Sequence, residues 1–442
     1  MQNNNYYDVT KWDVGNPLED IGAVINSIID DIKKRQNRSD VDSGGKPGAV
    51  IYIPPGDYSL RTQVNIDVSF LRIVGSGHGF TSSSIRFNTP EESWPSLHEL
   101  WPGGSRVKVE LETSERNVAA FLVKRDGSPR LSSIEFSNFC IDGLHFVENG
   151  PDEFAENTYL NSKIGIEIAS ANDSVRISGM GFIYLEQALL IYNADALSIH
   201  DNFIAECGSC IELVGWGQAS TITNNLIGAG FRGHSIYAEN HGGLLISANN
   251  VFPRGASSIH LRNVTRSNIS SNRLHSFYPG MLRLEGACSE NLISSNHLLR
   301  DGEPWTPFAG IDNGLENDFG VVRIEGDDNT FTANHVSVVL QLADTDLETT
   351  PVILRLARGT GNYVASNHML AKAIMSSPDD SCFEAQVDAL QSVSGSELQQ
   401  VTVVQVDSES SRNVILDSCS EAEAVVEFSE NVFRGIPGIK AD

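Results

Sequence analysis

Residues 198–204 read SIHDNFI, and the same short apolar run interrupted by an asparagine recurs along the chain. The later copies are TITNNLI (221–227), ISANNVF (246–252), NISSNRL (268–274), LISSNHL (292–298), TFTANHV (330–336) and YVASNHM (363–369). The anchoring asparagines are Asn202, Asn225, Asn250, Asn272, Asn296, Asn334 and Asn367, spaced by 23, 25, 22, 24, 38 and 33 residues. A period of 22–25 residues with one strand at each asparagine is typical of one coil of a parallel β-helix, and the two longer spacings indicate loop insertions.

A leucine-rich repeat is the rival fold, because it has a similar period and also contains an asparagine. Its LxxLxL spacing is absent here, and β-branched residues with Gly and Ser dominate the copies. Asparagine suits the anchoring position because it tolerates the left-handed backbone conformation and can hydrogen-bond its neighbours in a ladder. The repeat therefore predicts an all-β chain that folds as a parallel β-helix.

The regions that flank the repeat differ from it. Residues 18–35 place apolar side chains at helical spacing, with acidic residues first and basic residues last, as the helix dipole favours. A strand-forming run, AVIYIPPGDYSL (49–60), follows, so we expect the helix to cap the open end of the β-helix. The expected organisation is an N-terminal helix and cap in residues 1–48, a β-helix catalytic domain in residues 49–370, and C-terminal coils with a cap in residues 371–442.

The overall charge limits the partners that the chain can have. A net charge of −26 disfavours nucleic acid and anionic membranes, because both attract clustered Lys and Arg. No apolar run approaches the roughly 20 residues that a membrane helix needs. The first residues, MQNNNYYDVTKWDVG, lack the basic and apolar regions of a signal peptide. We therefore expect a cytoplasmic protein, or a secreted one if a leader has been trimmed away.

The cysteines do not resemble a disulfide framework, because they are scattered over a long chain: Cys140, Cys207, Cys210, Cys288, Cys382 and Cys419. Cys207 and Cys210 form a CGSC motif. A redox role for that motif needs a strand-to-helix turn, which the sequence does not indicate. We interpret these cysteines as residues that pack inside the coils.

Each coil carries a second predicted strand after its asparagine: CIELVG (210–215), SIYAEN (235–240), SIHLRN (258–263), MLRLEG (281–286), VVRIEG (321–326) and ILRLAR (353–358). Because side chains alternate between the faces of a strand, aligning the apolar residues places one residue of each run in an outward-facing column. This column reads Glu212, Tyr237, His260, Arg283, Arg323 and Arg355. A charged column is usually a solubilising face, but a sugar-binding groove also combines an acid with an aromatic ring, a His and an Arg.

The residue before each anchoring asparagine forms another column, in which only Asp201 is acidic. One coil thus supplies both acidic exceptions, Asp201 and Glu212. A pair of carboxylates is the minimum for glycosidic bond chemistry, since one protonates the leaving oxygen and the other activates the attacking group. In the alternative interpretation, Asp201 caps a turn and Glu212 pairs with Arg283 or His260.

Glu186 and Glu206 lie near this coil in the sequence and compete for the same roles. We count them, together with Tyr237, His260 and Arg283, as candidate substrate-binding residues. No metal-ligand cluster is predicted.

Several long runs of the sequence resemble glycoside hydrolase family 91, which holds the inulin fructotransferases and the difructose-anhydride hydrolases. The runs are IGAVIN (21–26), PGAVIYIPPGDY (47–58), FLVKRDGSPRLSSIEFSNFCIDG (121–143), ISGMGFIYLEQALLI (177–191), NADALSIHDNFIAECGSCIEL (193–213), NNVFPRG (249–255) and FYPGMLRL (277–284). The resemblance extends from about Tyr7 to Met369. It implies a right-handed parallel β-helix that forms a homotrimer, with the active site in a groove between subunits and with neither a metal nor an organic cofactor.

The resemblance also implies that the acidic pair of the family corresponds to Asp201 and Glu212. We expect Glu212 to be the general acid toward the leaving oxygen and Asp201 to orient or deprotonate the attacking group, with the reverse assignment left open. A fructotransferase releases a cyclic difructose dianhydride from the end of inulin, whereas a hydrolase opens difructose anhydride III with water to give inulobiose.

Two features favour the hydrolase. The chain shows no export segment, which an enzyme that meets the polymer inulin outside the cell would need, and its acidic loop at residues 146–160 would suit a lid over a small substrate. Inulin fructotransferase is the alternative. Pectate lyases and polygalacturonases are also parallel β-helices, but their carboxylate clusters are missing. A non-catalytic carbohydrate-binding solenoid would leave the two acidic exceptions to chance.

Overall fold

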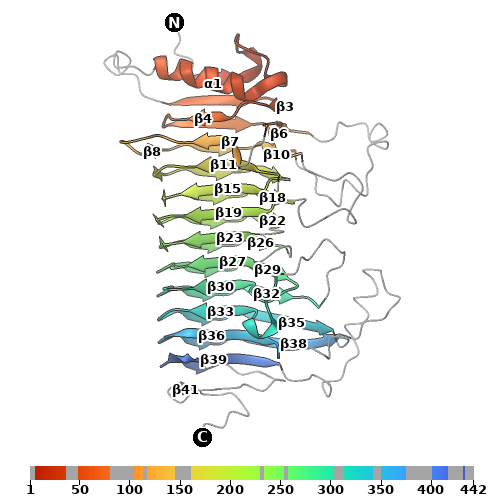
Figure 1. The fold of residues 1–442 in the computed structure, drawn as a ribbon, viewed down its shortest axis with the longest axis vertical. Helices are drawn as coiled ribbons and strands as arrows, with labels where there is room; N and C mark the ends of the chain where they lie inside the picture. Colours follow the sequence, from red (N-terminus) through yellow and green to blue (C-terminus); the bar gives the residue numbers. More distant parts are fainter. Residues whose placement is uncertain are drawn as a thin grey trace. The chain divides into compact units, whose positions relative to one another are not determined.

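The computed structural model describes residues 5–35, 48–79, 103–112, 117–144, 161–228, 233–252, 257–302, 313–341, 350–374, 401–416 and 432–433. The described residues belong to two compact units, of which the first ends at Ile227 and the second begins at Gly228. In both units short strands pair in parallel and successive coils repeat the same order of strands (Figure 1). The prediction of a parallel β-helix is confirmed.

The N-terminal helix α1 spans Pro17–Arg35 and packs on β3 (Gly56–Leu60) and β4 (Val64–Ile66) of the first unit (Figure 1). Its apolar stripe is buried, as the helical spacing predicted: Ile21, Val24, Ile25, Ile28, Ile29 and Ile32. Gly22 allows a close approach, because a Cβ at this position would lie 1.8 Å from the carbonyl oxygen of Thr62. The helix therefore covers backbone and side chains that would be exposed at the end of the first unit.

The first unit contains three main sheets and a short fourth one. In its first sheet the order is β1 (Tyr6–Asp8), β2 (Ala49–Ile53), β5 (Leu71–Gly75), β9 (Glu135–Ser137), β13 (Arg176–Ser178), β17 (Ser198–His200) and β21 (Thr221–Thr223). In the second it is β3, β6 (Ser105–Val109), β10 (Cys140–Asp142), β14 (Gly181–Ile183), β18 (Phe203–Ala205) and β22 (Leu226–Gly228). The third contains β4, β7 (Val118–Val123), β11 (Lys163–Ile168), β15 (Gln187–Tyr192) and β19 (Ser209–Val214). The fourth contains β8 (Leu131–Ser132), β12 (Asn172–Asp173), β16 (Ala194–Asp195) and β20 (Gly217–Gln218).

The second unit repeats this plan with its own strands. Its first sheet contains β25 (Leu245–Ser247), β28 (Asn268–Ser270), β31 (Leu292–Ser294), β34 (Thr330–Thr332), β37 (Tyr363–Ala365), β40 (Val414–Leu416) and β41 (Val432–Phe433). The second contains β26 (Asn250–Val251), β29 (Arg273–Ser276), β32 (His297–Arg300), β35 (His335–Gln341) and β38 (His368–Ile374). The third contains β23 (His234–Glu239), β27 (Ser257–Arg262), β30 (Leu282–Glu285), β33 (Val322–Glu325), β36 (Val352–Thr360) and β39 (Thr402–Ser411). The two-residue strand β24 (His241–Gly242) follows β23.

The sequence predicted one strand at each asparagine. In the structure, each asparagine-centred run contains two strands that meet at a corner. In SIHDNFI, β17 ends at His200 and β18 begins at Phe203 in a different sheet. The residue before the asparagine has a positive φ in the repeats, for example 58° at Asp201 and 58° at Ser271. This left-handed residue turns the chain from one sheet to the next, so a run that looks continuous in the sequence bends in the middle.

The buried asparagines form hydrogen-bonded ladders inside the corner of each unit. In the first unit Asn202 Nδ2 donates to Asn225 Oδ1 over 2.9 Å. In the second the same side-chain bond links Asn249, Asn272, Asn296, Asn334 and Asn367 in succession. The ladder satisfies amide groups that would be costly to bury unpaired.

The ladder corrects one anchoring residue. Asn249, not Asn250, is the ladder residue, and Asn250 begins β26. The residue with positive φ at this corner is accordingly Ala248, not Asn249. The Asn-Asn pair offered two alignments in the sequence, and the correct one places Asn249 and Asn272 a regular 23 residues apart.

Candidate active site

Glu212 lies on β19, and its carboxylate Oε2 accepts a 2.6 Å hydrogen bond from Gln187 Nε2. Gln187 begins β15, and its Oε1 accepts a bond from Asn117 Nδ2 at 3.2 Å. In the third sheet Glu212 is in register with Leu190, and Leu190 with Glu167, so this face has two acidic side chains two coils apart. The amide of Gln187 thus holds the carboxyl group of Glu212 in place.

Glu186 and Glu206, the acids that compete for the same roles, lie at the corner that precedes the third sheet. Glu186 comes directly before β15, and its Oε2 accepts a 2.6 Å bond from the backbone N–H of Ser162. Asn117 Nδ2 also approaches Glu186 Oε1 at 3.3 Å, so Asn117 contacts both Glu186 and Gln187. Glu206 has a φ of 53° at the turn between β18 and β19, and only 5% of it is exposed. Both acids are therefore near the start of the strands that carry Gln187 and Glu212.

Asp201 occupies the corner between β17 and β18. Its side chain is 60% exposed and lies 2.7 Å from His200 Nδ1. Its backbone N–H bonds the carbonyl of Thr223 in the next coil, which fixes the corner. The side chain thus projects outward from a rigid turn, where a carboxylate can reach a bound molecule.

Asp201 and Glu212 do not share a face of their coil. Asp201 lies between the first and second sheets, whereas Glu212 is on the third sheet. The corner between β17 and β18, which carries Asp201, is separated by the interior of the coil from the outer surface of the third sheet, which carries Glu212. Within one chain the two carboxylates therefore lie on different faces of the coil.

In the second unit, the outward column predicted from the sequence is present. Successive strands of the third sheet pair Tyr237 with His260, His260 with Arg283, Arg283 with Arg323, and Arg323 with Arg355. The alternation of inward and outward side chains fixed this register. The column is not uniformly exposed, however, because only 7% of His260 is accessible.

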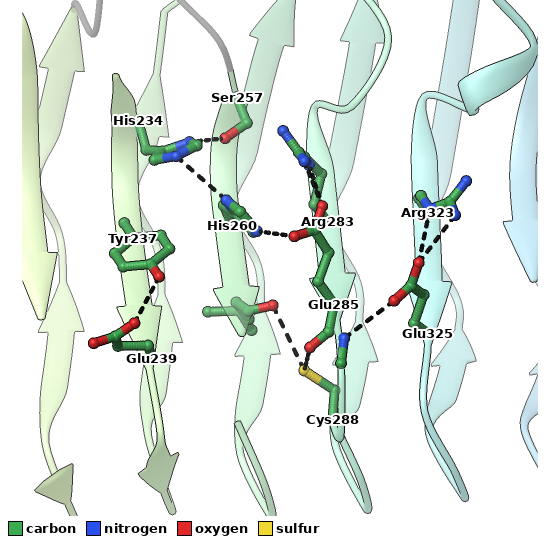
Figure 2. Close-up of polar contacts among 12 residues, drawn as sticks. His234, Tyr237, Glu239, Ser257, His260, Arg283, Glu285, Cys288, Arg323 and Glu325 are labelled. Carbon is green, nitrogen blue, oxygen red and sulfur yellow. Dashed lines mark hydrogen bonds and ion pairs between the residues drawn. The ribbon is translucent and has the colours of Figure 1, made fainter. Parts of the chain in front are cut away.

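Three aromatic rings cluster at the beginning of this column (Figure 2). The His234 ring stacks on Tyr237, with centroids 5.3 Å apart, and His260 lies edge-on to His234 at 4.6 Å and to Tyr237 at 5.2 Å. The Tyr237 hydroxyl donates to Glu239 Oε2 over 2.9 Å, which fixes the orientation of the ring. A rigid, half-buried set of rings offers a sugar ring an apolar face beside polar edges.

A chain of hydrogen bonds holds the two histidines (Figure 2). Ser257 Oγ lies 2.5 Å from His234 Nδ1, His234 Nε2 lies 3.3 Å from His260 Nδ1, and His260 Nε2 lies 2.9 Å from Glu285 Oε2. One choice of ring tautomers satisfies every contact in one direction: Ser257 donates to His234, His234 to His260, and His260 to Glu285. Arg283 donates to the other oxygen of Glu285.

The electrostatics agree with this arrangement. The hydrogen bond from His260 lowers the pKa of Glu285 to about 2, and Arg283 contributes in the same direction against the effect of burial. Burial, with the nearby His260 and Arg283, lowers the pKa of His234 to about 3. Burial and the bond to Glu239 raise the pKa of Tyr237 to about 12. At neutral pH the cluster therefore contains an ionised Glu285, a neutral His234 and a neutral phenol.

The sequence interpretation missed His234, Glu285 and Gln187. His234 begins β23, one residue before the run used for the alignment. Glu285 follows Arg283 by two residues, and Glu325 follows Arg323 by the same spacing, with an ion pair formed in both cases. Because period 2 returns to the same face of a strand, the repeated Arg-x-Glu pattern was a usable signal for a second outward column. Gln187 had no such signal.

Lowering the pH from 6.5 toward 3 is expected to destabilise the protein through His234. The unfolded chain takes up a proton at the ordinary pKa of 6.5, whereas the folded one does not until about pH 3, so the free energy of unfolding falls with pH across this window. One such group contributes at most about 1.4 kcal/mol per pH unit. Glu285 adds a further loss below its usual pKa of 4.5, as the pH approaches 2.

Urea unfolding of wild type and His234→Gln at pH 7, 6, 5 and 4 measures this effect. The variant should be less stable at pH 7 but should lose less stability on acidification. His368→Gln, a change of an exposed histidine on β38, is the control and should keep the wild-type slope. Equal slopes in wild type and His234→Gln would contradict the assignment.

The remaining sequence interpretations concern cysteines, metals and the acidic loop. Cys207 and Cys210 are free and fully buried, and burial raises the pKa of Cys207 to about 12, which agrees with packing and not with redox chemistry. Among the described residues, no cluster of three or more His, Cys, Asp or Glu side chains is arranged to hold a metal ion. No helix in the described part of the chain has the length and apolar character of a membrane span. The loop at residues 146–160 lies outside the described residues.

Two family models match parts of the chain. Residues 295–437 match one described as the beta helix repeat of inulin fructotransferase, and residues 122–305 match one described as periplasmic copper-binding protein (NosD). A curated relative, the DFA-I-forming inulin fructotransferase of Arthrobacter globiformis, is 45% identical over 375 residues, which are 83% of this chain and 90% of the relative.

Solved structures extend the similarity over nearly the whole chain. DFA-IIIase from Arthrobacter chlorophenolicus A6 in complex with GF2 is 64% identical, covers 99% of this chain and 100% of its own, and has a TM-score of 0.88. The same enzyme in complex with DFA-III is 63% identical with the same coverage and TM-score. The A-module of the mannuronan C-5 epimerase AlgE4 from Azotobacter vinelandii, 13% identical with a TM-score of 0.56 over 97% of this chain, shares the fold alone.

Proposed function

The chain belongs to the inulin fructotransferase family, glycoside hydrolase family 91, and from that membership we propose that it is an enzyme that hydrolyses difructose anhydride III to inulobiose. The observation that carries this proposal is the identity of 64% to DFA-IIIase over 99% of the chain. The identity to the fructotransferase is lower, at 45% over 83% of the chain. Substrate and reaction are therefore taken from the relative with the greater identity.

Inulin fructotransferase activity is the second candidate. The family model that matches residues 295–437 is described by that enzyme, and the curated relative carries its name. In that reaction a fructosyl hydroxyl of inulin, in place of water, attacks the neighbouring anomeric carbon. Both reactions need a proton donor for the leaving oxygen and a group that receives a proton from the attacking oxygen.

In the proposed mechanism Glu212 gives its proton to the oxygen that leaves the anomeric carbon. A water molecule attacks that carbon and loses a proton to Asp201, so one carbon–oxygen bond forms while another breaks and the two carboxyl groups end with exchanged protonation states. The bond from Gln187 supports this role for Glu212, because it fixes one oxygen and orients the carboxyl group. Tyr237, His260 and Arg283 are the proposed sugar contacts, held by the network around Glu285.

We also propose that the active enzyme is a homotrimer whose site is completed between two copies. The placement of Asp201 at a corner and Glu212 on another face supports this proposal. In a closed ring of identical subunits, the corner of one copy can meet the third sheet of the next. Neither acid would then need to move, and both would act from rigid elements.

Separate incubations with difructose anhydride III and with inulin, followed by chromatography of the products, test the activity. Inulobiose from the dianhydride is the expected result. Cyclic dianhydride released from inulin would assign the chain to the fructotransferases. If neither substrate is converted, the proposed function is wrong.

A further inference from the structure

Beyond the ring cluster, the outward column of the second unit continues into a polar pocket of about 450 Å³. Its charged lining residues are Arg323, Arg355, Arg358, Glu325, Asp407 and Glu409. Arg323 and Arg355 are the next two positions of the column after Arg283, and Gln405 on β39 follows Arg355 in register. We call this the arginine pocket. No step of the proposed hydrolysis uses it.

The arginines of this pocket are fixed in position and compensated in charge. Arg323 Nη2 bonds Glu325 Oε1 at 2.9 Å, and Arg355 Nε lies 3.0 and 3.1 Å from the two oxygens of Asp407. Arg358 approaches the second oxygen of Glu325 at 3.4 Å. Three guanidinium groups face three carboxylates, so the lining is close to neutral overall. Such a site favours an uncharged, hydroxyl-rich ligand over a phosphate or another anion.

The backbone also departs from the regular repeat here. The register between β33 and β36 shifts at Ile324 and Glu325, and that between β36 and β39 shifts at Leu356 and Arg358. Bulges re-aim side chains and are common beside functional sites, whereas an ion-pair face needs only regular strands. Two shifts at one pocket are a second observation that distinguishes it from an ordinary charged surface.

Phe319 connects the pocket to the ring cluster. The guanidinium of Arg283 lies 5.1 Å from the centroid of the Phe319 ring, and that of Arg323 lies 4.7 Å from it. Phe319 belongs to the 3-10 turn η4 (Asn317–Phe319), whose Asp318 carbonyl accepts a 2.8 Å bond from Arg355 Nη1. One short turn thus contacts three successive arginines of the column, Arg283, Arg323 and Arg355.

Distance decides which ligand can use this surface. Strands of one sheet are about 4.8 Å apart, so the three steps from His260 to Arg355 cover roughly 14 Å. A dianhydride contains only two fructosyl residues, joined by two linkages, and is too short to contact both ends. A linear chain with several fructosyl residues is long enough, and it carries the hydroxyl groups that the pocket can bind.

We propose that the arginine pocket is a remote subsite that binds fructosyl residues of a longer β-2,1-linked fructan whose end lies at the ring cluster. This inference rests on the part of the proposed function that both candidate reactions share, action on β-2,1-linked fructosyl units, and its test requires no turnover. In this subsite Arg355 and Gln405 donate to sugar hydroxyls, and the carboxylates accept from them.

Calorimetric titration tests the subsite in protein that carries Glu212→Gln, so that no ligand is consumed. The ligands are difructose anhydride III, inulobiose and linear fructans of three to eight residues. In this background we expect affinity to rise with chain length. Adding Arg355→Gln or Gln405→Ala should weaken binding of the long chains by about tenfold, because that is the size expected for a lost hydrogen bond to a charged or buried partner. The affinity for the dianhydride should change less than about twofold.

Arg266→Gln is the matched control, because Arg266 is an exposed arginine paired with Glu290 outside the column. It should leave the affinity for every ligand unchanged. Equal weakening of dianhydride and long chains, or no dependence on length in the parent, would overturn the subsite. If Arg355→Gln does not fold, Gln405→Ala decides the question, since no ion pair depends on it. Wild-type turnover of the dianhydride is measured separately, so failure of the proposed function and failure of the subsite give different results.

Discussion

Replacing Glu212 by glutamine is expected to lower turnover by about 10³-fold while leaving the fold intact, the loss that is typical when a general acid or base is removed. Glutamine has the same shape as glutamate, and its amide oxygen can accept the bond that Gln187 Nε2 now donates at 2.6 Å. The group that is lost is the exchangeable proton. The initial rate on difructose anhydride III, or on inulin if that is the substrate, measures the effect.

Glu167→Gln is the matched control for this substitution. Glu167 occupies the same column of the third sheet as Glu212, with Leu190 between them. It makes the same replacement of a carboxyl group by a carboxamide on the same face, so an effect of that replacement on the surface alone would appear in both variants. We expect Glu167→Gln to retain activity within about twofold, in line with surface substitutions away from a site. Retention of most activity by Glu212→Gln would remove Glu212 from the mechanism.

Mixing two inactive variants is expected to restore activity, if the site is completed between copies. A Glu212→Gln subunit still supplies Asp201, and an Asp201→Asn subunit still supplies Glu212. In randomly assembled equimolar trimers, one half of one half, about one quarter of the sites, contain both acids. Asparagine tolerates the left-handed conformation of residue 201, so the corner should survive the substitution.

The measurement is the specific activity after the two variants are co-expressed or refolded together, compared with each variant alone. Mixing Asp201→Asn with the double variant Asp201→Asn/Glu212→Gln is the control, since no subunit then supplies Asp201. Activity near one quarter of wild type supports a shared site. If the mixture is no more active than its components, no site combines the two acids from different copies and the interface proposal is wrong.

Several features of the fold could be read from local patterns. The helical spacing of residues 18–35 predicted α1, and the apolar alternation in runs such as SIHLRN predicted the strands of the third sheet within a residue or two. The register of Tyr237, His260 and Arg283 followed from the same alternation. These signals are strong because each side chain must face either the core or solvent, and a shift by one residue would exchange the two faces.

The candidate site was only partly accessible in this way. Glu212 was found because it breaks the outward column, but its partner Gln187 lies 25 residues earlier and has no motif. His234 was overlooked because it becomes significant only through Ser257 and His260, which belong to the next coil. The dipeptide Asn249–Asn250 was ambiguous until the ladder selected one of the two.

The sequence by itself thus determined the coil period, the capping helix and the order of side chains along one outward column. Those features depend on spacing within single strands and on the repetition of one pattern. Only the tertiary structure decided that Asp201 and Glu212 belong to different faces, that His234 and Glu285 hold His260, and that the column ends in a pocket. Each of these depends on where the chain turns and on contacts between neighbouring coils, and such contacts form between residues that no short stretch of sequence contains together.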